Sequence, residues 1–294
     1  MLLNTFLQQI RSSLLMIHHS GHDALTDLAN LFLNGGTIQE KRSISISSNF
    51  GESYEDSSPS DNPFDKWNEG SIALIPLNGI MLKSGSWFHY GVDDLAYLLN
   101  QAYKSPKIAG VLFKGNTPGG SIDSLYLMEE TLRNKSKPTW MLVDGTLCSC
   151  GMYIGSFCDR IFAMNEMCTL GGVGVFGRLV GPSENSGFKI VEVYPDESYL
   201  KNYPEREAMN GNPEPMKEEL SKLAIHFQNI IKQNRPGITD KEVFAGKTYF
   251  AKDAVAAGLI DAVKSERETV SELIAFIKNV PSQEVREEIS LMYK

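Results

Sequence analysis

Short apolar runs alternate with amphipathic stretches from residue 70 onward. The runs are bounded by turn-forming residues and are too short for independent helices, so they predict buried strands. The predicted strands are Ile72–Leu77, Ile108–Phe113, Thr139–Val143, Ile161–Met164 and Val173–Phe176. Helical spacing of apolar residues predicts helices over Val92–Lys104, Ser124–Asn134, Met152–Cys158 and Glu214–Asn234. This alternation predicts an α/β fold, a twisted and mainly parallel sheet with helices on both faces.

The N-terminal region has a different pattern. Its apolar positions step by three and four residues, which predicts helices at Leu3–His18 and Asp23–Leu33. A stretch rich in serine and poor in apolar residues follows, as is typical of a linker. The expected divisions are a helical appendage (1–36), a mobile Ser-rich linker (37–69) and one large domain (70–294).

Composition narrows the classes of function. The 294 residues carry a net charge of −8, from 28 Lys and Arg against 36 Asp and Glu, without a basic stripe. Nucleic-acid binding needs clustered positive charge, so we expect no nucleic-acid partner. We also expect no membrane-spanning segment and no signal peptide, because polar residues interrupt every apolar run. A membrane-surface role for the first helix is an alternative, although Arg11 is the one cation on its polar face.

The four cysteines do not form a metal-binding pattern. Cys148, Cys150, Cys158 and Cys168 lie 2, 8 and 10 residues apart, which fits neither paired zinc knuckles nor a spread disulfide framework. We therefore expect buried free thiols in a reducing compartment, and neither a metal nor a cofactor.

Two motifs at the ends of neighbouring predicted strands could carry chemistry. Thr117-Pro118-Gly119-Gly120 follows one strand, and Ser149 opens the helix after the next. Because parallel strands end at the same edge of a sheet, backbone amides of the first motif and the hydroxyl of the second could converge on one carbonyl group. Each motif also has a purely structural interpretation, the first as a tight turn and the second as a helix N-cap. The thiols of Cys148 and Cys150 are rival nucleophiles.

A third motif completes an ordered set. The segments T-P-G-G (117–120), C-S-C-G-M-Y (148–153) and L-G-G-V-G-V (170–175) stand in this order. They resemble the S-P-G-G, A-S-[GA]-[GA]-Y and T-G-S-I-G-V motifs of the signal peptide peptidase A family of serine peptidases, which includes phage and prophage head proteases. The resemblance covers roughly residues 70–275. Thr117, Gly172 and the two cysteines beside Ser149 depart from the family pattern, and Gly172 removes a hydroxyl.

The resemblance implies a fold of the Clp-protease/crotonase type and catalysis by a serine and a lysine. Ser149 is then the nucleophile, and Lys201, in a segment similar to the family's K-x-x-x-x-x-R-x-M-T, is the general base. Backbone amides of Gly119 or Gly120 and of Cys150 are expected to hold the oxyanion. A lysine accepts the serine proton only when it is neutral, so burial must lower its pKa from about 10.4.

The sequence therefore predicts a serine endopeptidase that cleaves peptide or protein substrates through an acyl-enzyme and assembles into a homo-oligomer. The lack of a membrane anchor and the single-copy length favour a phage capsid-maturation protease, with capsid or scaffold proteins as partners. Its expected location is the bacterial cytoplasm or the assembling prohead. The alternatives are a cellular peptidase that degrades signal peptides and a catalytically silent assembly module on the same fold.

Overall fold

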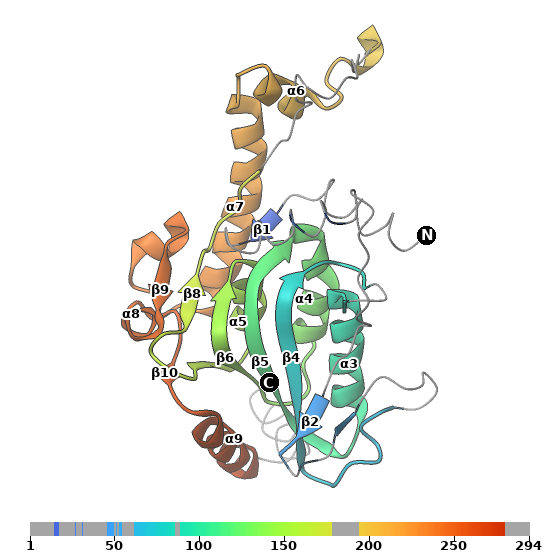
Figure 1. Cartoon of the computed structure of the whole chain (residues 1–294), viewed down its shortest axis with the longest axis vertical. Coiled ribbons are helices and arrows are strands. Elements are labelled where there is room, and N and C mark those ends of the chain that lie inside the picture. Colours follow the sequence, from blue (N-terminus) through green and yellow to red (C-terminus); the bar gives the residue numbers. More distant parts are fainter. Residues whose placement is uncertain are drawn as a thin grey trace, which may run out of the picture.

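A computed structural model shows an α/β sheet covered by helices (Figure 1). The structure describes residues 62–85, 89–177 and 194–279, and in the N-terminal region residues 15–17, 27, 31, 46–49, 51 and 53–54. One long helix, α7 (Glu214–Asn234), extends beyond the sheet (Figure 1).

Parallel strands form the centre of the sheet. In spatial order they are β4 (Ser71–Met81), β5 (Ile108–Ser121), β6 (Thr139–Cys148), β7 (Arg160–Ala163) and β10 (Ala262–Val263). Helices supply the crossovers between the first four, as a parallel sheet requires. The predicted α/β class with a mainly parallel sheet is confirmed.

Short strands extend the sheet at its margins. The antiparallel additions are β2 (Ile46–Ser48) on β4, β3 (Ser53–Tyr54) on β2, β9 (Thr248–Phe250) on β8 and β1 (Leu15–Ile17) on β5. Strand β8 (Thr169–Gly171) runs parallel to the end of β6. It therefore lies directly beside the last residues of β6, where Cys148 pairs with Gly171.

Helices cover both faces, as predicted. One face carries α3 (Val92–Lys104), α4 (Leu125–Arg133), α5 (Cys150–Ser156) and the C-terminal end of α7 (Glu214–Asn234), and the other carries α9 (Glu266–Asn279). Alternate residues of β4 define the two sides: Ile75 packs in the larger core with the first group, whereas Ile72 and Leu74 pack with Leu273 of α9. The remaining short elements are η1 (Ile122–Ser124), η2 (Asp196–Ser198), α6 (Tyr203–Met209), η3 (Lys241–Ala245) and α8 (Ala251–Ala256).

Several boundaries differ from the sequence prediction. Strand β5 does not end at Phe113 but continues to Ser121, so the T-P-G-G motif is part of a strand rather than a turn after it. The extension forms because β4 still offers backbone partners there, with Ile80 opposite Gly119. The predicted strand Val173–Phe176 is wrong, and the strand lies at Thr169–Gly171 instead, where β9 pairs with it.

The prediction of the first N-terminal helix is wrong at the residues that the structure describes. Leu15–Ile17, expected at the end of the first helix, is strand β1, because the end of β5 offers it a free backbone edge. The rest of that predicted helix lies outside the described residues. Of the second one, Asp27 and Leu31 are described, and both are helical.

The segment predicted as a mobile linker contributes to the core. Ile46 of β2 and Phe64 are fully buried, and the Phe64 and Trp67 rings pack edge to face with centroids 5.0 Å apart. Asn62 caps this turn, because its side-chain oxygen Oδ1 accepts the Phe64 N–H at 3.0 Å. The division of the chain into three parts stays a prediction. At Ile46 and Phe64, however, the segment 37–69 packs in the core and is not a linker.

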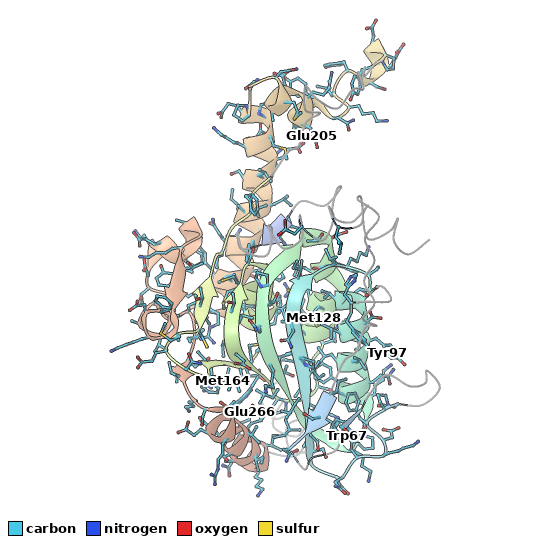
Figure 2. All side chains as sticks on the ribbon, in the orientation of Figure 1. Trp67, Tyr97, Met128, Met164, Glu205 and Glu266 are labelled. Atoms are coloured by element: carbon cyan, nitrogen blue, oxygen red, sulfur yellow. The ribbon has the colours of Figure 1, made fainter. Side chains whose placement is uncertain are left out.

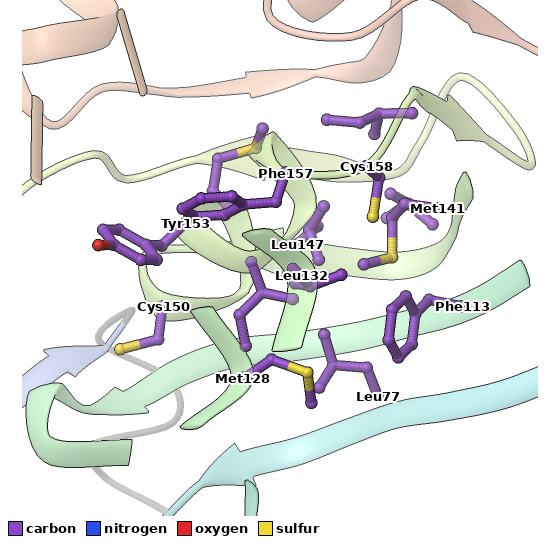
Figure 3. Packing of buried hydrophobic residues seen from close by; sticks show 14 of the residues in the cluster. Leu77, Phe113, Met128, Leu132, Met141, Leu147, Cys150, Tyr153, Phe157 and Cys158 are labelled. Atoms are coloured by element: carbon purple, nitrogen blue, oxygen red, sulfur yellow. The ribbon is translucent and has the colours of Figure 1, made fainter. Parts of the chain in front are cut away.

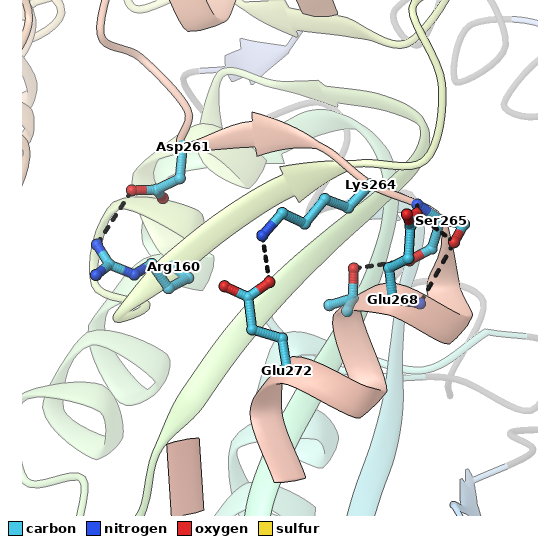
Figure 4. Close-up of polar contacts among 7 residues, drawn as sticks. Arg160, Asp261, Lys264, Ser265, Glu268 and Glu272 are labelled. Atoms are coloured by element: carbon cyan, nitrogen blue, oxygen red, sulfur yellow. Dashed lines mark hydrogen bonds and ion pairs between the residues drawn. The ribbon is translucent and has the colours of Figure 1, made fainter. Parts of the chain in front are cut away.

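Asp261, which follows α8, binds the C-terminal segment to the sheet. One carboxylate oxygen accepts the Ile161 N–H at 2.7 Å and pairs with Arg235 at 3.1 Å. The other faces Arg160 at 3.4 Å (Figure 4). Beyond it, the Ser265 hydroxyl and the Glu268 carboxylate, 2.6 Å apart, hold the start of α9 (Figure 4). Helix α9 was not predicted, although Val270, Leu273 and Ile277 have helical spacing.

Candidate active site

Ser149 stands at the turn from β6 into α5 in a strained backbone conformation. Its φ is 56° and its ψ is −118°, and among the described residues Asn202 is the one other non-glycine residue with positive φ. The turn is held from both sides: the Ser149 N–H donates to the Gly171 carbonyl at 2.9 Å, and the Ser149 carbonyl accepts the Tyr153 N–H at 2.9 Å. Strain of this kind persists only when the surroundings impose it, and it concentrates at functional sites.

The side chain of Ser149 does not cap the helix. It makes no capping hydrogen bond, and none of the described residues hydrogen-bonds to its hydroxyl. The residue is only 3% exposed. The N-cap interpretation of Ser149 is therefore wrong, and no residue in the described part of the chain holds its hydroxyl.

The T-P-G-G segment brings backbone close to this turn. An added Cβ on Gly120 would lie 1.9 Å from the Met81 carbonyl oxygen, and Gly119 has a φ of 101°, so both positions demand glycine. The Thr117 hydroxyl donates to the Gly79 carbonyl at 2.6 Å and accepts the Gly119 N–H at 3.1 Å. The Gly119 amide thus has a partner, and Gly120 pairs with Met81 of β4 and Met16 of β1, so both glycines stay candidate oxyanion donors.

The structure brings Gly120 and the start of α5 together. The Cys150 sulfur lies 3.5 Å from the Gly120 carbonyl oxygen and 3.6 Å from that of Ser121 (Figure 3). On the next residue, a Cβ added to Gly151 would lie 2.5 Å from the Thr117 methyl group. Ser149, Cys150 and Gly120 thus converge at the edge of the sheet, as the sequence predicts.

The two rival thiols are buried in the core. Burial raises the pKa of the Cys148 and Cys150 thiols to about 12, so both stay protonated near neutral pH. A protonated thiol is a poor nucleophile. The four cysteines are free and buried, as predicted.

Thr117 offers a test of this local architecture. Thr117→Val keeps the shape but leaves the Gly119 N–H without its acceptor, so we expect the free energy of unfolding to fall by about 1–3 kcal/mol. Thr117→Ser keeps the hydroxyl and is the matched control. Urea unfolding of both variants measures the difference, and equal stabilities would show that the two hydrogen bonds do not hold the segment.

Lys201 lies far from Ser149 in the single chain. Residues 194–226, here called the arm, comprise η2, α6 and the outer part of α7, and they project away from the sheet (Figures 1 and 2). Phe227 anchors α7 on Tyr153 of α5, with ring centroids 5.4 Å apart. The N-terminal end of α7 lies 13 residues before this anchor, roughly 20 Å away at 1.5 Å per residue, and Lys201 precedes it.

The surroundings of Lys201 are also not apolar in the single chain. Tyr199 is 64% exposed and Leu200 58%, so the expected burial of the amine is absent among the described residues. Within the arm, the Arg206 guanidinium stacks 4.1 Å from the centroid of the Tyr194 ring, which fixes this segment on α6. The structure therefore brings the predicted serine and oxyanion donors together, but not the predicted base.

Two other lysines do not replace it. The Lys247 carbonyl accepts the Gly172 N–H at 3.0 Å beside the site, but the ion pair with Glu242 raises the pKa of its ammonium and keeps it charged. Burial lowers the pKa of Lys137 to about 8, but this residue precedes β6 whereas Ser149 follows it. Ten strand residues separate the two by about 33 Å.

These features define a class of protein: an α/β protein with a strained, buried serine at a strand-to-helix turn beside a glycine-rich strand. Residues 131–279, just over half of the chain, match the family model for peptidase family S49. The chain belongs to this family, which confirms the resemblance of its motifs to signal peptide peptidase A. The matched range contains Ser149 and Lys201 and begins after Gly120.

Known relatives are distant. The putative signal peptide peptidase SppA of Enterococcus faecium is 26% identical over 219 residues, which cover 69% of this chain and 62% of that protein. Capsid assembly protease C of Escherichia phage lambda is 21% identical over 215 residues, covering 68% of this chain and 48% of that protein. The chain thus spans less than two thirds of either relative.

A solved structure of similar fold is a mutant of the 1510-N membrane-bound stomatin-specific protease. It is 14% identical, covers 70% of this chain and 86% of its own, and gives a TM-score of 0.47. Across the described part of the chain, no helix combines the length and apolar character needed to cross a bilayer.

Proposed function

We propose that this chain is a serine endopeptidase whose nucleophile is Ser149. The observation that carries the proposal is the Ser149 turn itself, a strained residue whose hydroxyl has no partner among the described residues and whose neighbour Cys150 packs against Gly120. Membership of peptidase family S49 supports the reaction class.

The geometry supports acyl transfer. The Ser149 oxygen attacks the carbonyl carbon of a peptide bond, and the Gly120 and Cys150 N–H groups stabilise the negative charge on the former carbonyl oxygen. The base takes the serine proton and passes it to the leaving amine, which leaves an acyl-enzyme. Water then hydrolyses the ester and restores the serine.

We propose further that the base is Lys201 of a neighbouring copy. The arm exposes apolar side chains, and surface of this kind is often buried in an assembly. The exposed residues are Tyr199, Leu200, Met209 and Ile225. The arm of one chain can then cover the Ser149 turn of the next, and the same contact buries the lysine beside the serine. This assembly is the expected homo-oligomer.

Labelling with a fluorophosphonate probe tests the proposal. We expect one covalent adduct per chain, mapped to Ser149 by mass spectrometry, and loss of labelling when the protein is unfolded. Labelling that persists in a Ser149→Ala variant would assign the reactive group elsewhere. Absence of labelling in the assembled protein would favour the silent assembly module.

For the substrate we propose a phage capsid or scaffold protein, in keeping with the similarity to capsid assembly protease C of phage lambda. A cellular role in signal-peptide degradation is the second candidate, which the similarity to the Enterococcus faecium protein supports. Competition between a purified scaffold protein and a signal peptide for one preparation of the enzyme distinguishes them. The preferred substrate has the higher kcat/KM.

A further inference from the structure

The end of β5 has one edge that faces the Ser149 turn. On its first edge, β4 pairs along β5 as far as Gly120, which lies opposite Met81. On its second edge, β6 pairs as far as Thr117, opposite Leu147, and then turns away at Ser149 into α5. The second edge of β5 at Gly119–Ser121 is therefore no longer paired with β6, and it lies next to the turn that carries Ser149.

Strand β1 occupies this second edge. It runs antiparallel to β5, with Ile17 opposite Gly119, Met16 opposite Gly120 and Leu15 opposite Ser121. Because a strand has two edges and β4 holds the first, β1 lies in line with β6, end-on to the Ser149 turn. Figure 1 shows β1 at the end of β5, and Figure 3 shows it beside Cys150.

We propose that the segment around Leu15–Ile17 is an intramolecular inhibitor that holds the strand position of an extended substrate peptide. The inference rests on the proposed peptidase function. Extended peptides bind by adding a strand to an exposed sheet edge, where main-chain hydrogen bonds supply affinity. The paired residues Gly119 and Gly120 leave this edge without side chains, which suits such an addition. One strand at a time fits the edge.

Prolines in β1 test the inhibitor in the full chain. Proline lacks the N–H that a strand donates, and successive residues of an antiparallel strand alternate in hydrogen bonding. A Met16→Pro, Ile17→Pro double variant therefore loses at least one hydrogen bond to β5. Its kcat/KM for a fluorogenic peptide should rise about tenfold, as expected when a groove that is open in about one molecule in ten becomes free.

Two controls separate this effect from a general change in the protein. Gln8→Pro with Gln9→Pro introduces the same prolines outside β1 and should leave kcat/KM at the parental value. A labelled peptide with the sequence of residues 12–20 should bind the β1 variant at least about ten times more tightly than the parent, and a scrambled peptide should bind neither. Thermal unfolding verifies that all variants are folded.

The outcomes distinguish this inference from the proposed function. Equal kcat/KM of the β1 variant and an active parent overturns the inhibitor and leaves the peptidase intact. If neither protein hydrolyses any peptide, the proposed function fails. The binding of the labelled peptide to the parent and to the β1 variant then tests the inhibitor by itself. Tighter binding to the β1 variant then supports the occupied edge, and equal binding overturns it.

Discussion

Ser149→Ala should lower kcat/KM for peptide hydrolysis by about 10⁴–10⁶-fold, because no other group at the turn can form the acyl-enzyme. The adjacent thiols are buried, and their pKa values of about 12 keep them protonated. The measurement is steady-state hydrolysis of a fluorogenic peptide, with the folded state verified by circular dichroism.

The control for this prediction is a variant with both neighbouring thiols removed. Cys148→Ala with Cys150→Ala should keep most of the activity, because the oxyanion donor at Cys150 is its backbone amide. A dead double variant together with an active Ser149→Ala protein would transfer the nucleophile to a thiol.

The strain at Ser149 adds a readout that is independent of activity. At a φ of 56°, glycine is favoured over alanine, so Ser149→Gly should be more stable than Ser149→Ala by about 1 kcal/mol, although both are inactive. Urea unfolding measures the difference. Equal stabilities would contradict the strained turn.

Lys201→Met should abolish hydrolysis at every pH, and Lys201→Arg should fail as well because a guanidinium stays protonated. A lysine accepts the serine proton only as the neutral amine, so kcat/KM should fall as the pH is lowered. Replacing each of the five histidines should leave this dependence on pH in place.

Mixing the two inactive variants tests whether the base comes from a neighbour. Co-refolded Ser149→Ala and Lys201→Met chains pair an intact serine with an intact lysine at about one interface in four, so about a quarter of the parental activity should return. A mixture that assembles and stays inactive places both groups in one chain and contradicts the shared site.

The predictable parts of the fold are those with strong local patterns. The bounds of α3 and α7 agree with the sequence prediction, because their apolar faces and ends are marked in the sequence. The extension of β5 was not predicted, because Gly119 and Gly120 disfavour a strand locally, and pairing with the distant strands β4 and β1 stabilises one there. Strand β1 is similar, since its conformation depends on a distant edge.

For the candidate site, sequence order was sufficient to place Ser149 beside Gly120, because parallel strands end at one edge. The strain at Ser149 was not predictable, since it depends on the Gly171 carbonyl of another strand. The position of Lys201 was not predictable either. It depends on the direction in which α7 leaves the core, which Phe227 and Tyr153 determine through their packing.

The projecting arm has a consequence for when the enzyme acts. With the proposed nucleophile on the sheet and the proposed base in the arm, a newly synthesised chain would carry the two halves of the site far apart. In dilute solution the rate of hydrolysis should therefore scale with the square of the chain concentration. Under this proposal proteolysis would begin only where many copies gather, and solitary chains would stay inactive without a separate inhibitor protein.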